Sequence, residues 1–320
     1  MEAEQLYEYK NCNLCPRKCG ADRNKGRGYC KAGDKIKIAR AGLHMWEEPC
    51  ISGSRGSGAI FFSGCNLGCI FCQNKEISSG ETGKEISCGR LTEIFFELKD
   101  KGANNINLVT ADIYIPSIRK AIYDARMSGF DLPFILNTSG YINKESIESL
   151  DGLIDIYLPD MKYIRDKDAL RYSNAPDYPD VCMAAVDEMV RQQPECVFEK
   201  TGDELILKKG VVVRHLLMPG MLIQAKMILK YLHERYGDKI LLSLMSQYTP
   251  NGCLKACPEI DRPVSENEYR SLVRYAENTG ITRGYIQDKT SADEAYIPDF
   301  DLSGVIKSCC GSEKGKRELS

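Results

Sequence analysis

The strongest constraint on the fold is an alternation of short apolar runs with longer amphipathic segments over residues 51–290. Each run is rich in Ile, Val, Leu or Phe, which is typical of a strand buried on both faces. The predicted strands are Ala59–Phe62, Ile106–Val109, Phe134–Asn137, Ile154–Leu158, Val211–Leu217 and Ile240–Leu244. The predicted helices are Leu91–Lys101, Ser117–Met127, Tyr178–Gln192, Met221–Tyr236 and Ser265–Asn278.

This strand-then-helix order predicts a parallel sheet with right-handed crossovers. Six strands are too few for a closed eight-stranded barrel, so the predicted fold class is α/β, with a partial (β/α)6 TIM-like barrel. In such folds the chemistry takes place at the carboxyl ends of the strands.

Composition excludes several classes of protein. The 320 residues carry 43 Lys and Arg against 45 Asp and Glu, a net charge of −2, which argues against a dedicated nucleic-acid binder. The first ten residues have no apolar core, so we expect no signal peptide. Charged residues interrupt the longest apolar stretch, Val211–Ile223, so we expect no membrane span. These features predict a soluble, cytoplasmic protein.

Three of the fifteen cysteines, Cys65, Cys69 and Cys72, follow the first predicted strand on one short loop. Gly64 and Gly68 let the backbone of this loop wrap closely around a compact group. No fourth cysteine is nearby, whereas a structural zinc site or an ordinary iron–sulfur cluster takes four ligands. Three thiolates leave one iron of a 4Fe–4S cube open for a substrate.

The spacing C-x3-C-x-aromatic-C after a first barrel strand, with Phe71 as the aromatic residue, resembles the signature of radical S-adenosylmethionine (SAM) enzymes. In that family the amine and carboxylate of SAM chelate the fourth iron, and reductive cleavage yields a 5′-deoxyadenosyl radical. The resemblance implies a 4Fe–4S cluster on Cys65, Cys69 and Cys72. It also implies SAM as cofactor and an oxygen-sensitive oxidoreductase. A chain that keeps many exposed thiols reduced would also suit an anaerobic host.

Four segments narrow this resemblance. Trp46–Gly53, Phe61–Asn66, Arg214–Gly220 and Leu244–Tyr248 are similar to the pyruvate formate-lyase activating enzyme-like proteins, in the branch with an N-terminal cysteine extension. That branch implies a glycyl-radical enzyme as partner and a reduced flavodoxin or ferredoxin-type electron donor. Radical modification of another protein, an RNA or a small molecule remains an alternative. So does a non-catalytic iron–sulfur or zinc redox sensor.

The resemblance also implies a SAM pocket. Phe71 belongs to it through the cysteine motif. After the second strand, Thr110, Ala111 and Asp112 stand where the family places a Gly-Gly-Glu-type turn whose backbone meets the SAM amine. The chain departs from the family at this turn, where the backbone can still serve as the contact. After the third strand, Asn137 takes the position of an aspartate and is the expected cofactor contact.

Two further strand ends complete the implied pocket. Asp160-Met161-Lys162 matches an Asp-Leu-Lys stretch, which places Lys162 within reach of the SAM carboxylate as a cationic donor. His215 matches a histidine that approaches the SAM ribose. Without the resemblance, a hydrogen-bonded core histidine is the competing interpretation of His215.

We predict three regions: a cysteine-rich extension over residues 1–50, the radical SAM partial barrel over 51–300 and a flexible tail over 301–320. The extension contains a second predicted four-ligand set: Cys12, Cys15, Cys19 and Cys30. A structural zinc ion, an auxiliary iron–sulfur cluster and no metal all remain open. Nearby basic residues would offset the charge of a four-thiolate site: Arg17, Lys18, Arg23, Lys25 and Arg27. Cys253, Cys257, Cys309 and Cys310 are left unassigned.

Overall fold

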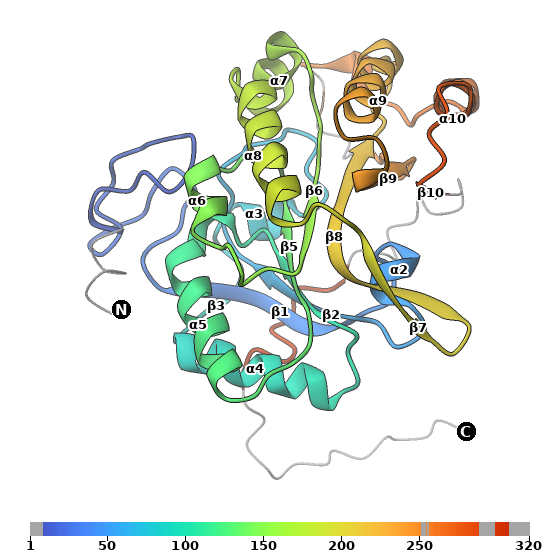
Figure 1. Ribbon diagram of the computed structural model, residues 1–320. Helices are drawn as coiled ribbons and strands as arrows, with labels where there is room; N and C mark the ends of the chain where they lie inside the picture. Colours follow the sequence, from blue (N-terminus) through green and yellow to red (C-terminus); the bar gives the residue numbers. More distant parts are fainter. Residues whose placement is uncertain (1–8, 251–253, 255, 288–297, 307–320) are drawn as a thin grey trace, which may run out of the picture.

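The computed structural model describes residues 9–250, 254, 256–287 and 298–306. Its centre is one sheet with the strand order β10-β9-β8-β6-β5-β4-β2-β1-β3, and β7 pairs with β8 beside this path. From β2 to β10 the strands of this path pair in parallel. Within the described residues the end strands β3 and β10 do not pair with each other, so the sheet is open (Figure 1). The predicted α/β partial barrel is confirmed.

The strands are β1 (Ile36–His44), β2 (Ser57–Phe62), β3 (Lys84–Ile86), β4 (Ile106–Val109), β5 (Phe134–Thr138), β6 (Ile156–Pro159), β7 (Val197–Thr201), β8 (Glu204–Leu216), β9 (Ile240–Met245) and β10 (Gly284–Ile286). The α-helices are α2 (Pro49–Ser52), α3 (Lys75–Ser78), α4 (Cys88–Asp100), α5 (Ile115–Met127), α6 (Lys144–Glu148), α7 (Asp166–Ser173), α8 (Tyr178–Gln192), α9 (Leu222–Tyr236) and α10 (Glu266–Asn278). Three short 3-10 helices are η1 (Asp112–Tyr114), η2 (Gly237–Lys239) and η3 (Pro258–Ile260).

The predicted elements are present, and β4 and α8 have the predicted bounds. Every residue of β2, β4, β5 and β6 is buried, as expected of strands covered on both faces. The Ser265 side chain accepts a hydrogen bond from the Glu268 amide, and the Glu268 side chain bonds back, so the predicted capping signal of α10 is a complete capping box. β8 begins seven residues before the predicted Val211 because its first half forms a hairpin with β7.

β1 is a strand that the alternation of buried runs did not predict. It lies in the N-terminal region and pairs antiparallel with β2, with His44 opposite Ser57 and Ile38 opposite Phe62. Its residues alternate only in part between buried and half-buried positions, so it lacks the uniform apolar run used to find the other strands. The pairing makes residues 36–44 part of the same sheet as the barrel strands.

The start of the predicted tail packs on β1. The Leu302 amide donates to the Ala39 carbonyl over 3.0 Å, and Val305 is buried. Residues 307–320, including Cys309 and Cys310, lie outside the described residues, as does Cys253. In the part of the chain that the structure describes, no helix has the length and apolar character needed to cross a membrane.

Candidate active site

The loop between β2 and α3 carries Cys65, Cys69 and Cys72 at the carboxyl end of β2. Gly64 makes this loop possible because its φ is +93°, in the region that favours glycine. A Cβ at this position would lie 2.7 Å from the Cys30 carbonyl oxygen and 2.9 Å from Ile113 Cδ1. A side chain at residue 64 therefore forces the loop away from its neighbours.

Hydrogen bonds hold the sulfurs of this loop. The Leu67 amide lies 3.4 Å from Cys65 Sγ, and the Ser173 hydroxyl donates to Cys69 Sγ over 3.0 Å. Burial raises the pKa of the Cys65 thiol far above its usual range. Burial also raises the pKa of Cys69, to about 11, against the opposing charge of Lys162. A bound metal would supply the positive charge that keeps such buried sulfurs as thiolates.

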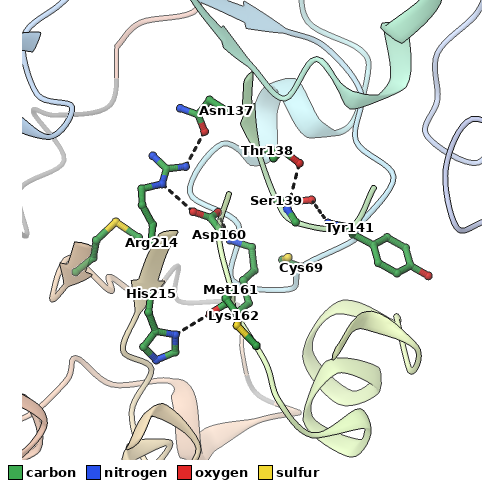
Figure 2. Close-up of polar contacts among 12 residues, drawn as sticks. Cys69, Asn137, Thr138, Ser139, Tyr141, Asp160, Met161, Lys162, Arg214 and His215 are labelled. Carbon is green, nitrogen blue, oxygen red and sulfur yellow. Dashed lines mark hydrogen bonds and ion pairs between the residues drawn. The ribbon is translucent and has the colours of Figure 1, made fainter. Parts of the chain in front are cut away.

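Lys162 lies at the carboxyl end of β6, beside Cys69 (Figure 2). Its Nζ donates to Asp160 Oδ2 over 2.5 Å, and both side chains are mostly buried. Burial alone would lower the pKa of Lys162, but the charges of Asp160 and Cys69 outweigh it, and the pKa is raised. Lys162 is therefore a fixed cation next to a predicted cluster ligand.

Arg214 on β8 joins three of the elements around the site. It donates from Nε to Asp160 Oδ1 over 2.9 Å, from Nη2 to Asn137 Oδ1 over 2.6 Å and from Nη1 to Glu47 Oε2 over 3.3 Å. Burial acts to raise the pKa of Asp160, but Arg214 and Lys162 outweigh it, so this pKa is lowered. The carboxylate of Asp160 thus stays charged between two cations (Figure 2).

Arg214 and Glu47 are functional candidates that the sequence analysis missed. Both belong to segments noticed only for their resemblance to a family. Arg214 interrupts an otherwise apolar predicted strand, and this buried charge was the available signal. Because Asn137 accepts from Arg214 and donates to Glu47 over 3.4 Å, its side-chain amide already has protein partners. Its predicted contact with the cofactor stays a prediction.

His215, next to Arg214, has one free ring nitrogen. Its Nδ1 lies 2.7 Å from the Met161 carbonyl oxygen, while the buried Nε2 has no hydrogen-bond partner among the described residues (Figure 2). Burial lowers the pKa of His215 to about 4, so the ring is neutral near pH 7. A neutral ring that donates from Nδ1 offers Nε2 as an acceptor, which suits a ribose hydroxyl.

The predicted turn after β4 contains a second buried polar atom without a hydrogen-bond partner among the described residues. Asp112 Oδ2 accepts from the Thr138 hydroxyl over 2.8 Å, but the buried Oδ1 has no partner among the described residues. Burial raises the pKa of Asp112 to about 7. Thr110 has a φ of +61°, which is strained for a β-branched residue and typical of functional turns. Ala111 is fully buried between them.

Phe71 is buried and packs against Tyr248, with ring centroids 5.9 Å apart.

In the N-terminal region Cys12, Cys15 and Cys30 are buried and Cys19 is exposed. Across the described residues, no three or more His, Cys, Asp or Glu side chains surround a position for a single metal ion. The second metal site stays a prediction.

The comparison with protein families decides the classification. The model of the Radical SAM superfamily matches residues 59–232, which is more than half of the chain. This chain belongs to the radical SAM superfamily. The matched region runs from β2 into α9 and includes the three-cysteine loop, Lys162 and His215. Membership implies a 4Fe–4S cluster, SAM and an enzyme that uses SAM radical chemistry.

Individual relatives are distant. An uncharacterized protein of Methanocaldococcus jannaschii, MJ0674, is 27% identical over 281 residues, which cover 85% of this chain and 76% of that protein. The crystal structure of Streptococcus suis SuiB bound to S-adenosylmethionine matches with a TM-score of 0.45 and 13% identity over 70% of this chain and 48% of SuiB. The chain thus spans about half of the length of SuiB. A domain of pyruvate-formate lyase-activating enzyme from Bacteroides vulgatus matches with a TM-score of 0.37 and 11% identity over 53% of this chain and 89% of that domain.

The residues of this radical SAM enzyme fit its cofactors. Three thiols lie on one loop shaped by Gly64, and as ligands of a 4Fe–4S cluster they would leave one iron without a protein ligand. Lys162 adds a cation beside Cys69 that suits a carboxylate. The unpartnered atoms of His215 and Asp112 are buried polar groups, which a polar ligand would satisfy.

Proposed function

We propose that this radical SAM enzyme abstracts a hydrogen atom from a glycine of a glycyl-radical partner enzyme. The observation that supports this target is the contact between Glu47 and Arg214. These residues come from two of the segments that resemble pyruvate formate-lyase activating enzyme-like proteins, and both lie at the candidate site. A third such segment also lies near the cysteine loop, because Tyr248 packs against Phe71. The resemblance is therefore concentrated where substrate and cofactor would bind.

The chain's own groups have distinct roles in this proposal. A reduced 4Fe–4S cluster bound at the three-cysteine loop would supply the electron for cleavage of SAM. Cys65, Cys69 and Cys72 hold the cluster. Lys162 binds the SAM carboxylate, and His215 Nε2 accepts a hydrogen bond from the ribose. The electron comes from a reduced flavodoxin or ferredoxin-type protein in the cytoplasm.

The polar network keeps these groups in place. Arg214 holds Asp160 through its Nε, and Asp160 holds Lys162. A lysine on a flexible stem is thereby limited to few rotamers before SAM binds, which lowers the entropy cost of binding. Since the same arginine also contacts Glu47, the segment before α2 is tied to the same position.

The first test is anaerobic turnover. The protein is reconstituted with iron and sulfide, reduced and mixed with SAM, and 5′-deoxyadenosine is quantified. We expect product from the native protein and none from Cys65→Ala. Absence of product from protein with a fully loaded cluster, both alone and with the partner enzyme present, would contradict the proposed chemistry.

A second test identifies the hydrogen donor. A pyruvate formate-lyase-type glycyl-radical enzyme is prepared with deuterium at the glycine α-carbon and mixed with the reduced protein and SAM. We expect deuterium in 5′-deoxyadenosine and a glycyl radical signal in the electron paramagnetic resonance spectrum. Unlabelled 5′-deoxyadenosine without a glycyl signal would contradict the glycine target and favour modification of another substrate. Comparison of flavodoxin, ferredoxin and a chemical reductant tests the donor.

A further inference from the structure

The N-terminal region that contains Cys12, Cys15, Cys19 and Cys30 packs against the loop of Cys65, Cys69 and Cys72, here called the catalytic loop. The Cys65 amide donates to the Cys30 carbonyl oxygen over 3.2 Å. Arg17 donates from Nε to the Asn66 carbonyl over 2.8 Å, and its guanidinium lies over the Tyr29 ring at 4.4 Å. Interactions that keep this region folded therefore also hold the loop that carries the three predicted cluster ligands.

Among the residues of this region that the structure describes, Arg23 is the fully buried cation, with 1% of its surface exposed. Its guanidinium lies over the rings of Tyr9 and Tyr114 and donates to the carbonyls of Gly33 and Ile113, over 2.6 Å and 2.7 Å. Among the described residues no carboxylate pairs with it. An arginine stays charged in a protein, and a buried charge without an opposite charge is costly. We therefore expect an anionic group close to Arg23.

Two tyrosines and several cysteines around Arg23 can become anionic. Burial raises the pKa values of Tyr9 and Tyr114, so the cysteines are the candidates for the anion. Arg23 Nη1 lies 3.8 Å from Cys12 Sγ. A Cβ placed on Gly28 would lie 3.5 Å from Cys19 Sγ, from Cys30 Sγ and from Arg23 Cδ. The sulfurs of Cys19 and Cys30 thus approach the same point beside the arginine. Cys15, three residues after Cys12, is also buried.

We propose that Cys12, Cys15, Cys19 and Cys30 hold a second metal centre through four thiolates, with Arg23 as its buried counter-ion. Four thiols release four protons when they bind one Zn²⁺, which leaves a doubly negative centre. A 4Fe–4S cluster held by four thiolates is also an anionic centre, so Arg23 serves both. The sulfurs do not surround a single point among the described residues, so metal binding draws them together by side-chain rotation. The centre is independent of the proposed glycine target.

The test removes the catalytic cluster first. The triple variant Cys65→Ser/Cys69→Ser/Cys72→Ser is purified without oxygen, and zinc, iron and sulfide are measured. We expect about one zinc, or about four irons with sulfide, per chain. Adding Cys15→Ser and Cys30→Ser removes this metal. Adding Cys196→Ser, at the residue before β7, leaves the metal in place. A triple variant without stoichiometric metal overturns the proposal, and so does metal that survives the loss of Cys15 and Cys30.

The role of Arg23 is tested by chelator competition in the same triple variant. We expect Arg23→Gln to weaken metal binding by about 10- to 100-fold, and Arg23→Lys to weaken it less because the charge remains. Because Arg23→Gln perturbs a buried position, Co²⁺ spectra of the triple variant with Arg23 intact provide a second measurement. Thiolate-to-cobalt bands of four-sulfur coordination support the site. Co²⁺ spectra without such bands overturn the site, and unchanged affinity in Arg23→Gln overturns the counter-ion.

Discussion

The backbone amide of Cys65, a predicted cluster ligand, donates a hydrogen bond to the carbonyl oxygen of Cys30 over 3.2 Å. Gly64 lets these two segments approach, because any Cβ there would meet the same carbonyl at 2.7 Å. The catalytic loop therefore rests on the N-terminal region. Its geometry depends on residues that lie well before the motif in sequence.

Arg17 is the side chain that strengthens this contact. It donates to the carbonyls of Asn66 and Asn174, from the catalytic loop and from the end of α7. We expect Arg17→Ala to lower the free energy of unfolding by about 2 kcal/mol and to speed loss of cluster iron to a chelator, since charged hydrogen bonds are lost. Denaturant titration and iron release measure both effects. Lys25→Ala, at an exposed position, is the control. Equal behaviour of the two variants would contradict the role of Arg17 in holding the catalytic loop.

Lys162→Ala should weaken SAM binding while the cluster content stays intact. Loss of one charged hydrogen bond to the SAM carboxylate corresponds to about 10- to 100-fold in Kd. Asp160 keeps its contact with Arg214 in this variant, so its carboxylate is not left without a cation. Calorimetry on reconstituted protein provides the Kd, and iron analysis provides the cluster content. Lys167→Ala, on the exposed face of α7, is the matched control; an unchanged Kd in Lys162→Ala would refute the pocket assignment.

Ser173 tunes the cluster through its hydrogen bond to Cys69 Sγ. A hydrogen bond to a ligand sulfur stabilises the more negative, reduced cluster. We therefore expect Ser173→Ala to make the reduction potential of the catalytic cluster more negative, as measured by anaerobic redox titration. Tyr163→Phe is the control, because Tyr163 contacts the Ser173 hydroxyl without touching the sulfur. An equal shift in both variants would mean that the effect is general loosening of the site.

Removal of Arg214 should destabilise the protein strongly. Its partners Asp160 and Glu47 are largely buried; Glu47 would lose its cation, and Asp160 would keep only Lys162. Breaking a buried ion pair in this way costs about 3–5 kcal/mol, so Arg214→Met should lower the free energy of unfolding by that amount. Arg235→Ala breaks the exposed pair with Asp187 and should change stability little. Similar denaturation midpoints for the two variants would contradict the structural role of Arg214.

His215 gives stability a defined pH dependence. The pKa of His215 falls from 6.5 to about 4 on burial, so below pH 6.5 the unfolded chain binds a proton that the folded chain does not. Its stability contribution is present above pH 6.5 and is lost as the pH falls toward 4. Between pH 7.5 and 5.5 this loss is about 1 kcal/mol. Urea titrations at both pH values should show a smaller difference for His215→Gln; an identical difference in both proteins would exclude His215 as the cause.

Much of the fold and part of the site follow from local sequence. Buried parallel strands need continuous apolar runs, and this requirement located β2, β4, β5, β6, β8 and β9. Three cysteines, an aromatic residue and two glycines on a loop after the first such strand predicted the cluster site. β1 was missed because a strand half-covered by neighbours shows no uniform apolar run.

The sequence by itself determined the fold class and the three thiols of the catalytic loop, because both depend on spacing along the chain. Only the tertiary structure decided that Glu47 from the segment after β1 and Arg214 from β8 share one network with Asp160. It also decided that Arg23 is buried among cysteines with no carboxylate beside it among the described residues. The physical reason is that a charge's partner is set by distance in space, and these partners are separated by many residues in sequence.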